Sequence, residues 1–202
     1  MPLFSLPAPL VLASTSAYRR AQLARLGVPF ECTKPEYDEA PVPGLDPRAL
    51  IAHHARQKAK VVQATGQWPD AWILAADQGV VLDEADGAVL LGKPGTTQAA
   101  VAQLLRLAGR EHELHTVVVL LRPDGKLFGR TVPVTLRLRP LESDEAAAYV
   151  AQDEPLDCAG SYKIERAGPA LLEWARGDDP TAIEGLPMMA VAALLREAAK
   201  AP

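Results

Sequence analysis

The sequence predicts a mixed α/β fold, in which helices flank a twisted sheet. Two observations predict this class. In the first half of the chain, short apolar runs alternate with helical patterns, which is typical of strands joined by helices. In the second half, apolar runs are separated by short turn signals, which is typical of hairpins. A chain of 202 residues, 49% hydrophobic and 23% charged, is expected to fold as one domain over residues 1–202.

The chain is expected to begin with a strand, a tight turn and a helix. The buried apolar run Leu10–Ala13 predicts the strand. Ser16 is a suitable N-cap for a helix over Ala17–Leu26, and Gly27 suits the position just after its end. A strand over Phe30–Thr33 follows, and then the acidic, proline-rich stretch PEYDEAPVPG. A loop of that length can line a cleft.

A long helix is expected next. Asp46 precedes Pro47 at the start of the pattern DPRALIAHHARQKAKVVQAT, and Gly66 lies just beyond its end. The remaining elements are expected to be strands over Ala71–Ala76, Gly79–Leu82, Leu114–Leu121 and Thr131–Leu138, turns at Glu84–Gly87 and Pro123–Gly125, and helices over Thr97–Ala108, from Ser143, and over Leu186–Lys200. We expect a site in a cleft between two parts of the curved sheet.

The composition limits the partners of the protein. A formal net charge of -4 and an isoelectric point near 5.6 argue against broad binding to nucleic acid, which needs basic residues on one face. No apolar run reaches the roughly 18 residues that suggest a membrane span. Cys32 and Cys158 do not form a disulfide framework, so we expect reduced thiols. The sequence predicts a cytoplasmic protein with a small-molecule partner and no nucleic-acid or membrane partner.

The stretch LASTSAYRR is a candidate anion site. Arg19 and Arg20 follow Ser14 and Ser16 in the first turn of the expected helix, where free N–H groups and the helix dipole attract anions. The alternative is a solvated arginine pair on the helix surface. Spacing alone does not separate the two interpretations.

Asp77 and Gln78 are candidates because they end the buried apolar stretch ILAADQG. A buried carboxylate is costly unless a cation or hydrogen-bond donors meet it. The alternative is an Asp that forms a turn before Gly79. The acidic loop favours the functional interpretation, because several oxygen ligands near phosphate suit Mg²⁺ or Mn²⁺. The carboxylates of the acidic loop are Glu36, Asp38 and Glu39.

Three lysines lie in different settings that could converge on one cleft. Lys93 and Lys163, in GKPG and GSYK, lie in glycine-containing stretches, where the backbone can approach a ligand closely. Lys58, in QKAK, lies on the long helix and, taken alone, is expected at its surface. Isolated lysines more often provide solubility than function.

Several common sites are excluded. His53 and His54 are adjacent on a helix, and His112 and His115 should point to opposite faces of a strand, so neither pair suits zinc. No G-x-S-x-G motif supports a serine hydrolase. The phosphate loops G-x-x-x-x-G-K-[ST] and G-x-G-x-x-G are also missing from the sequence.

The residues resemble a known family, the Maf nucleotide pyrophosphatases. The resemblance runs through LVLASTSAYRRAQLARLGVPFE, PEYDE, QKAK, ILAADQGVVLD, LGKPGTTQAA, EPLDCAGSYKIE and EGLPMMAVAALL, and so covers nearly the whole chain. The sequence is more similar to the subfamily that hydrolyses 7-methyl-GTP than to the one that takes dTTP and UTP. The pair Asp77-Gln78, in place of Asp-Thr, and the stretch CAGSYKIE carry that distinction.

The resemblance implies a fold of two lobes around a deep central cleft, of the Maf and ITPase-like type. It also implies dependence on a divalent cation and cleavage of a nucleoside triphosphate to the monophosphate and pyrophosphate. Asp77 matches the proton acceptor, and Glu39 with Asp77 would hold Mg²⁺ or Mn²⁺. The positions matching substrate choice are Tyr18, Gln78 and Glu165, and the other polar cleft positions are Arg19, Lys58, Lys93 and Lys163.

Two departures and two alternatives accompany the resemblance. Ala17 replaces a usual proline, which would loosen the turn before the first helix, and Val117 replaces a usual glycine, which would narrow the sheet without touching the chemistry.

We expect Arg19, supported by Arg20, Ser14 and Ser16, to hold the triphosphate. The alternatives are a dTTP/UTP pyrophosphatase and a nucleotide-binding regulator of septum formation without turnover. A homodimer is compatible with each.

Overall fold

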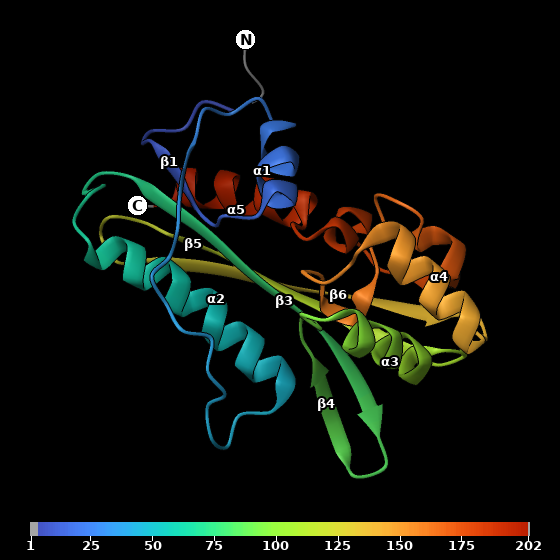
Figure 1. The fold of residues 1–202 in the computed structure, drawn as a ribbon. Helices are drawn as coiled ribbons and strands as arrows, with labels where there is room; N and C mark the ends of the chain where they lie inside the picture. The colour runs from blue at the N-terminus through green and yellow to red at the C-terminus, as the bar shows by residue number, and fades with distance from the viewer. Residues whose placement is uncertain (1–3, 202) are drawn as a thin grey trace.

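The computed structural model describes residues 4–201 and contains, among them, a seven-stranded sheet and five α-helices (Figure 1). The strands are β1 (Leu10–Ala13), β2 (Glu31–Thr33), β3 (Trp72–Glu84), β4 (Gly87–Leu91), β5 (Glu111–Leu121), β6 (Leu127–Leu138) and β7 (Leu172–Arg176). The α-helices are α1 (Ala17–Ala24), α2 (Pro47–Ala64), α3 (Thr97–Leu107), α4 (Ser143–Asp153) and α5 (Met188–Lys200). Short 3₁₀ helices are η1 (Ala159–Ser161), η2 (Gly168–Leu171) and η3 (Pro180–Glu184).

The sheet is mixed, as predicted. Its strand order is β2-β1-β3-β5-β6-β7, and β4 pairs with β3 as a branch. β1 is parallel to both β2 and β3, whereas all pairings from β3 through β7 are antiparallel. The predicted mixed α/β class is therefore confirmed.

β3 changes its partner strand along one edge. Its beginning pairs with β1, up to Leu74, and its end pairs with β4, from Val80 onward. Within the described chain, residues 75–79 of β3 have no partner strand on that edge, while β5 pairs with them on the other edge. Asp77 lies in the middle of this open stretch. The prediction that Asp77 ends a strand was wrong, because the ladder with β5 continues through Gly79.

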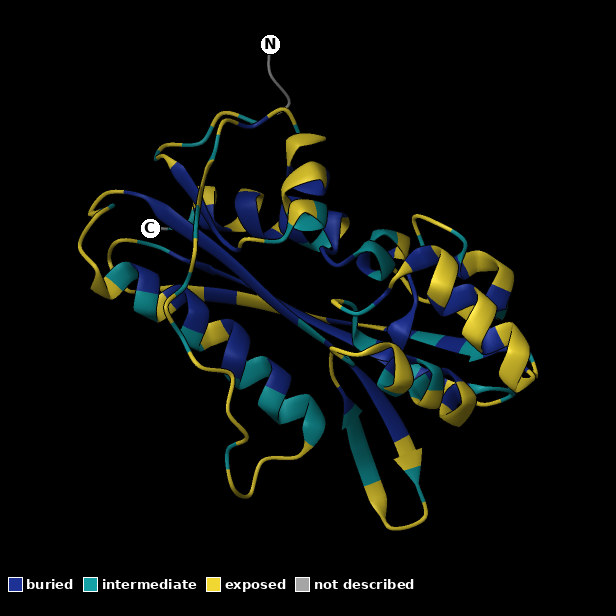
Figure 2. Cartoon of the chain, in the orientation of Figure 1, coloured by how far each residue is buried: buried dark blue, intermediate teal, exposed yellow. Residues whose placement is uncertain are grey.

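The helices divide into two groups at the two ends of the long strands (Figure 1). α2 covers one face of β3 and β5, and α5 covers the opposite face of β5 and β6. At the far end, α3 and α4 pack on each other beside η1 and the ends of β3 and β6. Between the groups, β3 and β5 are buried over most of their length, whereas β6 alternates between buried and more exposed residues (Figure 2). This is the two-lobed arrangement that the family resemblance implies.

Most differences from the expected elements lie at their ends. α1 ends at Ala24 rather than Leu26, α5 begins at Met188 rather than Leu186, and β2 and α3 are each one residue shorter than expected. Pro187 explains the start of α5, because the residue before a proline is disfavoured in helical conformation. β5 and β6 begin earlier, at Glu111 and Leu127, and β7 was not predicted.

No helix within residues 4–201 combines the length and the apolar character that a membrane span requires. Both cysteines, Cys32 and Cys158, carry free thiols, as expected.

His112 should make the stability of the fold depend on pH. This residue of β5 is 3% exposed, and burial lowers its pKa from 6.5 to about 4, an effect that a backbone hydrogen bond with Arg110 only partly opposes. The unfolded chain therefore takes up a proton near pH 6.5, whereas the folded chain resists it. The contribution of neutral, buried His112 to the free energy of unfolding is therefore fully present above pH 6.5, and it is lost as the pH falls toward 4. Between pH 7 and about pH 4.5 we expect a loss of about 2 kcal/mol from this group.

Urea denaturation at these two pH values would measure the effect. His112→Gln should lose about 2 kcal/mol less than the wild type on acidification. His53→Gln, at a partly exposed histidine, is the matched control and should behave like the wild type. Equal pH dependence in His112→Gln and the wild type would contradict the assignment.

Candidate active site

Three charged residues from three elements meet beside the open edge of β3. Asp77 comes from β3, Lys58 from α2, and Glu39 from the acidic loop before α2. The Lys58 ammonium donates to Asp77 Oδ1 at 2.6 Å and lies 2.8 Å from Glu39 Oε1. The side chains of Lys58 and Asp77 are 8% and 9% exposed, whereas that of Glu39 is 51% exposed. The structure thus joins two predicted carboxylates through one buried cation.

The helical pattern of α2 explains why Lys58 is buried. Asp46 accepts hydrogen bonds from the first backbone N–H groups of the helix, and Pro47 takes its first position. The helix packs an apolar stripe against the sheet, formed by Ile51, Ala55, Ala59 and Val62. Lys58 falls within that stripe by the spacing of three and four residues, a signal already visible in the sequence. The expectation that Lys58 lies at the surface was wrong.

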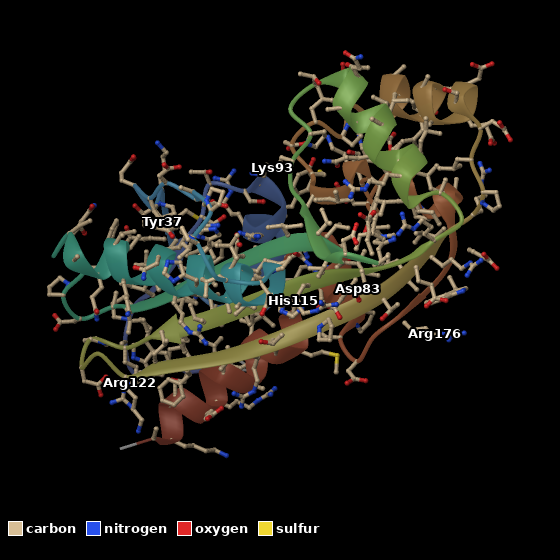
Figure 3. All side chains as sticks on the ribbon, turned by 90° about the horizontal axis from the view of Figure 1, so that it is seen from below. Tyr37, Asp83, Lys93, His115, Arg122 and Arg176 are labelled. Atoms are coloured by element: carbon tan, nitrogen blue, oxygen red, sulfur yellow. The ribbon has the colours of Figure 1, made fainter. Side chains whose placement is uncertain are left out.

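Glu39 is held as a carboxylate. Burial alone would raise its pKa, but the hydrogen bond from Lys58 and the charges of Lys58, Lys93 and His54 outweigh it, and the pKa is lowered. Lys93 itself is exposed in the segment between β4 and α3 (Figure 3), and its charge acts on Glu39 from there. Glu39 therefore interacts with the charges of three neighbours, Lys58, Lys93 and His54.

Tyr37 and His54 adjoin this cluster, and sequence reasoning missed both. The Tyr37 hydroxyl lies 2.9 Å from His54 Nδ1, with Tyr37 beside α2 (Figure 3). Burial lowers the pKa of His54, although the charges of Asp77 and Glu39 oppose that shift. The neutral ring is therefore favoured, so that Nδ1 can accept from the tyrosine. The contact depends on the path of the loop, which no local pattern predicts.

Arg19 lies across the open edge of β3. Its Nη1 donates to Ala76 O at 2.7 Å, and its Nε donates to Gly185 O at 3.0 Å. Burial lowers its pKa, although the charges of Asp77 and Glu39 act in the opposite direction. Arg19 thus satisfies a carbonyl of β3 that has no strand beside it and joins β3 to the turn before α5.

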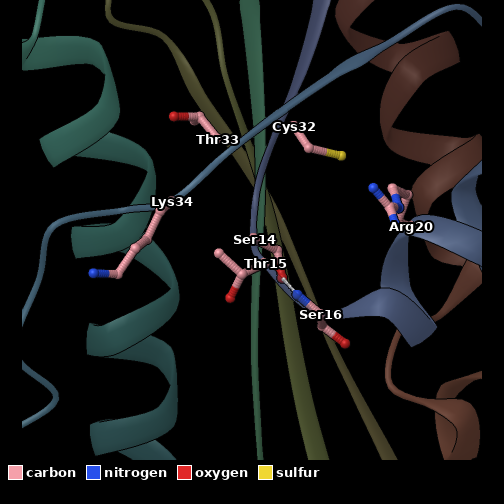
Figure 4. Close-up of a pocket in the computed structure, with 7 residues that line it drawn as sticks. All are labelled: Ser14, Thr15, Ser16, Arg20, Cys32, Thr33 and Lys34. Atoms are coloured by element: carbon pink, nitrogen blue, oxygen red, sulfur yellow. Dashed lines mark hydrogen bonds between the residues drawn. The ribbon is translucent and has the colours of Figure 1, made fainter.

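Arg20 points elsewhere. It lines a cavity of about 250 Å³ between the start of α1 and β2 (Figure 4). The other lining residues are Ser14, Thr15, Ser16, Cys32, Thr33 and Lys34. Ser16 caps α1 by accepting from the Arg19 N–H at 3.4 Å, and Ser14 accepts from the Ser16 N–H at 3.1 Å. Asp77 and Lys58 do not line this cavity, so the structure does not bring Arg20 and the serines into the cluster around Asp77.

Gln78 faces the side of the sheet opposite Asp77, because successive residues of a strand alternate. Its amide donates to Thr116 Oγ1 and to Ala182 O, both at 2.7 Å. A Cβ added at Gly185 would lie 4.0 Å from the Gln78 amide oxygen and 3.8 Å from Arg19 Cγ. Gln78 and Arg19 therefore flank the same turn, on the side of the sheet away from α2.

Tyr18 and Lys163 join the two lobes. The Lys163 ammonium is hydrogen-bonded to Tyr18 and lies 3.3 Å from Asp157. Burial would lower the pKa of Lys163, but these two partners outweigh it and the pKa is raised. Glu165 is exposed two residues further on. The contact brings the start of α1 next to the segment that carries Glu165.

The two departures from the family pattern have different settings. Ala17 begins α1 without disturbing the cap at Ser16. Val117 lies directly opposite Asp77 in the ladder between β3 and β5 and packs in the cluster beneath α2. It therefore adjoins the candidate carboxylate of Asp77.

His112 and His115 point to opposite faces of β5, as predicted. His112 lies 3.1 Å from the Tyr162 hydroxyl, and His115 lies 2.6 Å from Glu113 on the face that α2 covers. Within residues 4–201, no group of three or more His, Cys, Asp or Glu side chains is gathered as a metal site.

Comparison with known proteins identifies the family. The family model described as Maf-like protein matches residues 9–198. The chain belongs to the Maf-like family. Two relatives of this Maf-like chain are each named 7-methyl-GTP pyrophosphatase. The one from Xanthomonas campestris pv. campestris (strain 8004) is 44% identical over 94% of this chain and 95% of its own. The one from Aromatoleum aromaticum (strain DSM 19018 / LMG 30748 / EbN1) is 42% identical over 93% of this chain and 94% of its own.

A solved structure supports the fold of the Maf-like chain. A HAM1 protein from Coxiella burnetii matches with a TM-score of 0.51, covering 94% of this chain and 99% of that chain. Its sequence identity is 17%, so the likeness concerns the fold alone.

Proposed function

We propose that this Maf-like chain hydrolyses a nucleoside triphosphate to the monophosphate and pyrophosphate, and that its preferred substrate is 7-methyl-GTP. The observation that carries the proposal is the convergence of Asp77 and Glu39 on Lys58 Nζ, in a chain with relatives that carry that name. The Lys58 ammonium beside the open edge of β3 suits a negatively charged phosphoryl group, and the two carboxylates suit a divalent cation that would offset the charge of the phosphates.

Asp77 is the general base in this proposal. Its carboxylate would orient a water molecule for attack on a phosphorus atom and take its proton. Lys58, at 2.6 Å, keeps the carboxylate in place. The attack would break the bond between the α and β phosphates, so that pyrophosphate leaves.

The carboxylates also fit a divalent cation. Asp77 and Glu39 already approach one positive charge at 2.6 and 2.8 Å, which suits two of the oxygen ligands that Mg²⁺ or Mn²⁺ prefers. Further ligands would come from phosphate oxygens and water. A cation bound there would lower the pKa of the attacking water and polarise the phosphoryl oxygens.

The phosphates would meet the cationic groups of both lobes. Arg19, Lys58 and Lys93 each interact with Asp77 or Glu39. Lys163, which contacts Tyr18 at the start of α1, would add a cation from the other lobe. The cavity with Arg20, Ser14 and Ser16 is a second cationic region, which suits the far end of the triphosphate chain. Lys34 lies in the same cavity and adds a cation that the sequence had not singled out.

The base would lie near Tyr18 and Glu165. Methylation at N7 gives guanine a positive charge, so an aromatic face and a carboxylate favour it. Glu165 can accept from the guanine N1–H and amine, and the amide oxygen of Gln78 would accept at a base edge. The free thiols suit a reducing compartment, and we place the activity in the cytoplasm.

A panel of 7-methyl-GTP, GTP, dTTP and UTP with Mn²⁺ tests the proposal, with products followed by phosphorus NMR. We expect pyrophosphate release and the highest kcat/KM for 7-methyl-GTP. Orthophosphate release from the γ position would contradict the reaction, and better use of dTTP or UTP would favour the other subfamily.

Variants of Glu165 test the choice of base. Glu165→Ala should lower kcat/KM for 7-methyl-GTP by about 10- to 100-fold, because a charge-assisted hydrogen bond is lost. Glu165→Gln should lose less. Glu173→Ala, at an exposed glutamate on β7, is the matched control and should leave kcat/KM unchanged. An unchanged value in Glu165→Ala would remove this residue from the site.

A further inference from the structure

The acidic loop contacts α2 at two places, and the spacing of the two contacts along the loop matches their spacing along the helix. The Tyr37 hydroxyl lies 2.9 Å from His54 Nδ1, and Glu39 Oε1 lies 2.8 Å from Lys58 Nζ. Tyr37 and Glu39 are two residues apart, which extended chain spans in about 6.6 Å. His54 and Lys58 are four residues apart on a helix, which corresponds to a rise of about 6 Å. The loop can therefore make both contacts while it runs along one face of α2.

We propose that Tyr37 and His54 are positioning residues, which hold Glu39 against Lys58 and so set its distance from Asp77. The proposal rests on the function proposed above. It adds two residues that neither the family resemblance nor the names of the relatives assign to the site.

Burial supports this role. His54 is 4% exposed, and its ring packs against that of Tyr37 with centroids 5.7 Å apart. Tyr37 is half-buried, whereas its neighbours Glu36 and Asp38 are exposed. Tyr37 is therefore the side chain by which this part of the loop is anchored to the helix.

Glu39 needs such an anchor because its own side chain is 51% exposed. Water competes with an exposed carboxylate for its cation, and holding the side chain in one place costs conformational entropy. Asp77, in contrast, is fixed by a strand with β5 beside it. Of the two carboxylates, only Glu39 depends on the position of a loop.

Tyr37→Phe removes the hydroxyl and keeps the ring. We expect kcat for 7-methyl-GTP to fall about 5-fold, the effect of one lost hydrogen bond, while KM changes by less than about 2-fold. His54→Leu should resemble Tyr37→Phe. His54→Asn keeps an acceptor near the position of Nδ1 and should restore kcat to within about 2-fold of the wild type. His53→Asn is the matched control, because His53 lies next in sequence but makes no hydrogen bond to Tyr37.

A double-mutant cycle separates positioning from general destabilisation. In a Glu39→Ala background, Tyr37→Phe should lower kcat by less than about 1.5-fold, because its effect acts through Glu39. An equal loss in both backgrounds would overturn the proposal, as would wild-type kcat in Tyr37→Phe.

Amide hydrogen exchange gives a readout that does not depend on turnover. In the protein without nucleotide, exchange over residues 34–46 should become about 5-fold faster in Tyr37→Phe and stay unchanged in His53→Asn. Unchanged exchange in Tyr37→Phe would overturn the proposal. If the wild type hydrolyses none of the nucleotides, the proposed function fails, and faster exchange in Tyr37→Phe would still support the anchoring of the loop.

Discussion

Asp77→Asn is expected to fold like the wild type and to lose about 10²- to 10⁴-fold in kcat. The asparagine oxygen can still accept from Lys58, which now donates to Asp77 Oδ1 at 2.6 Å, so the packing beneath α2 should survive. The amide cannot take a proton from water or carry charge for a divalent cation. Pyrophosphate release from 7-methyl-GTP, together with thermal unfolding, would measure both expectations.

Asp83→Asn is the matched control for this variant. Asp83 lies on the same strand as Asp77, but its side chain is 72% exposed and pairs with Arg48. Its kcat should remain within about 2-fold of the wild type, since an exposed pair contributes little. A folded Asp77→Asn protein with near wild-type kcat would remove Asp77 from the role of general base.

The early part of the fold could be predicted because local chemistry and tertiary structure agree there. Ser16 and Asp46 cap the helices that the sequence assigns to them, and the apolar run Leu10–Ala13 is a buried strand. β7 could not be predicted, because its sequence LEWAR mixes charged and apolar residues and is a strand only through its pairing with β6.

The site was less predictable, since it depends on contacts between distant segments. The sequence indicates that Asp77 and Gln78 matter, but the continuation of β3 places them on opposite faces. Arg19 and Arg20 are adjacent, yet one reaches the edge of β3 and the other lines the cavity beside β2. Lys58 is different: taken alone it was expected at the surface, but its burial can be read from the sequence, because it lies within the apolar stripe of α2.

Lys58→Met is expected to destabilise the protein by about 3 kcal/mol, because it leaves a buried carboxylate without its cation. The Asp77 side chain is 9% exposed, and the guanidinium of Arg19, whose charge acts on Asp77, already donates through Nε and Nη1 to backbone carbonyls. Methionine fills a similar volume, so the loss should come from charge and not from a cavity. Urea denaturation at neutral pH would measure the free energy of unfolding.

Two further variants decide whether the buried pair is the cause. Adding Asp77→Asn to Lys58→Met should recover most of the lost stability, because a neutral amide is far less costly to bury than an unpaired carboxylate. Lys60→Met, at an exposed position two residues along the same helix, should change stability by less than about 0.5 kcal/mol. If Lys58→Met were as stable as Lys60→Met, the contact at 2.6 Å would contribute little to the fold, and Lys58 would be retained for the substrate alone.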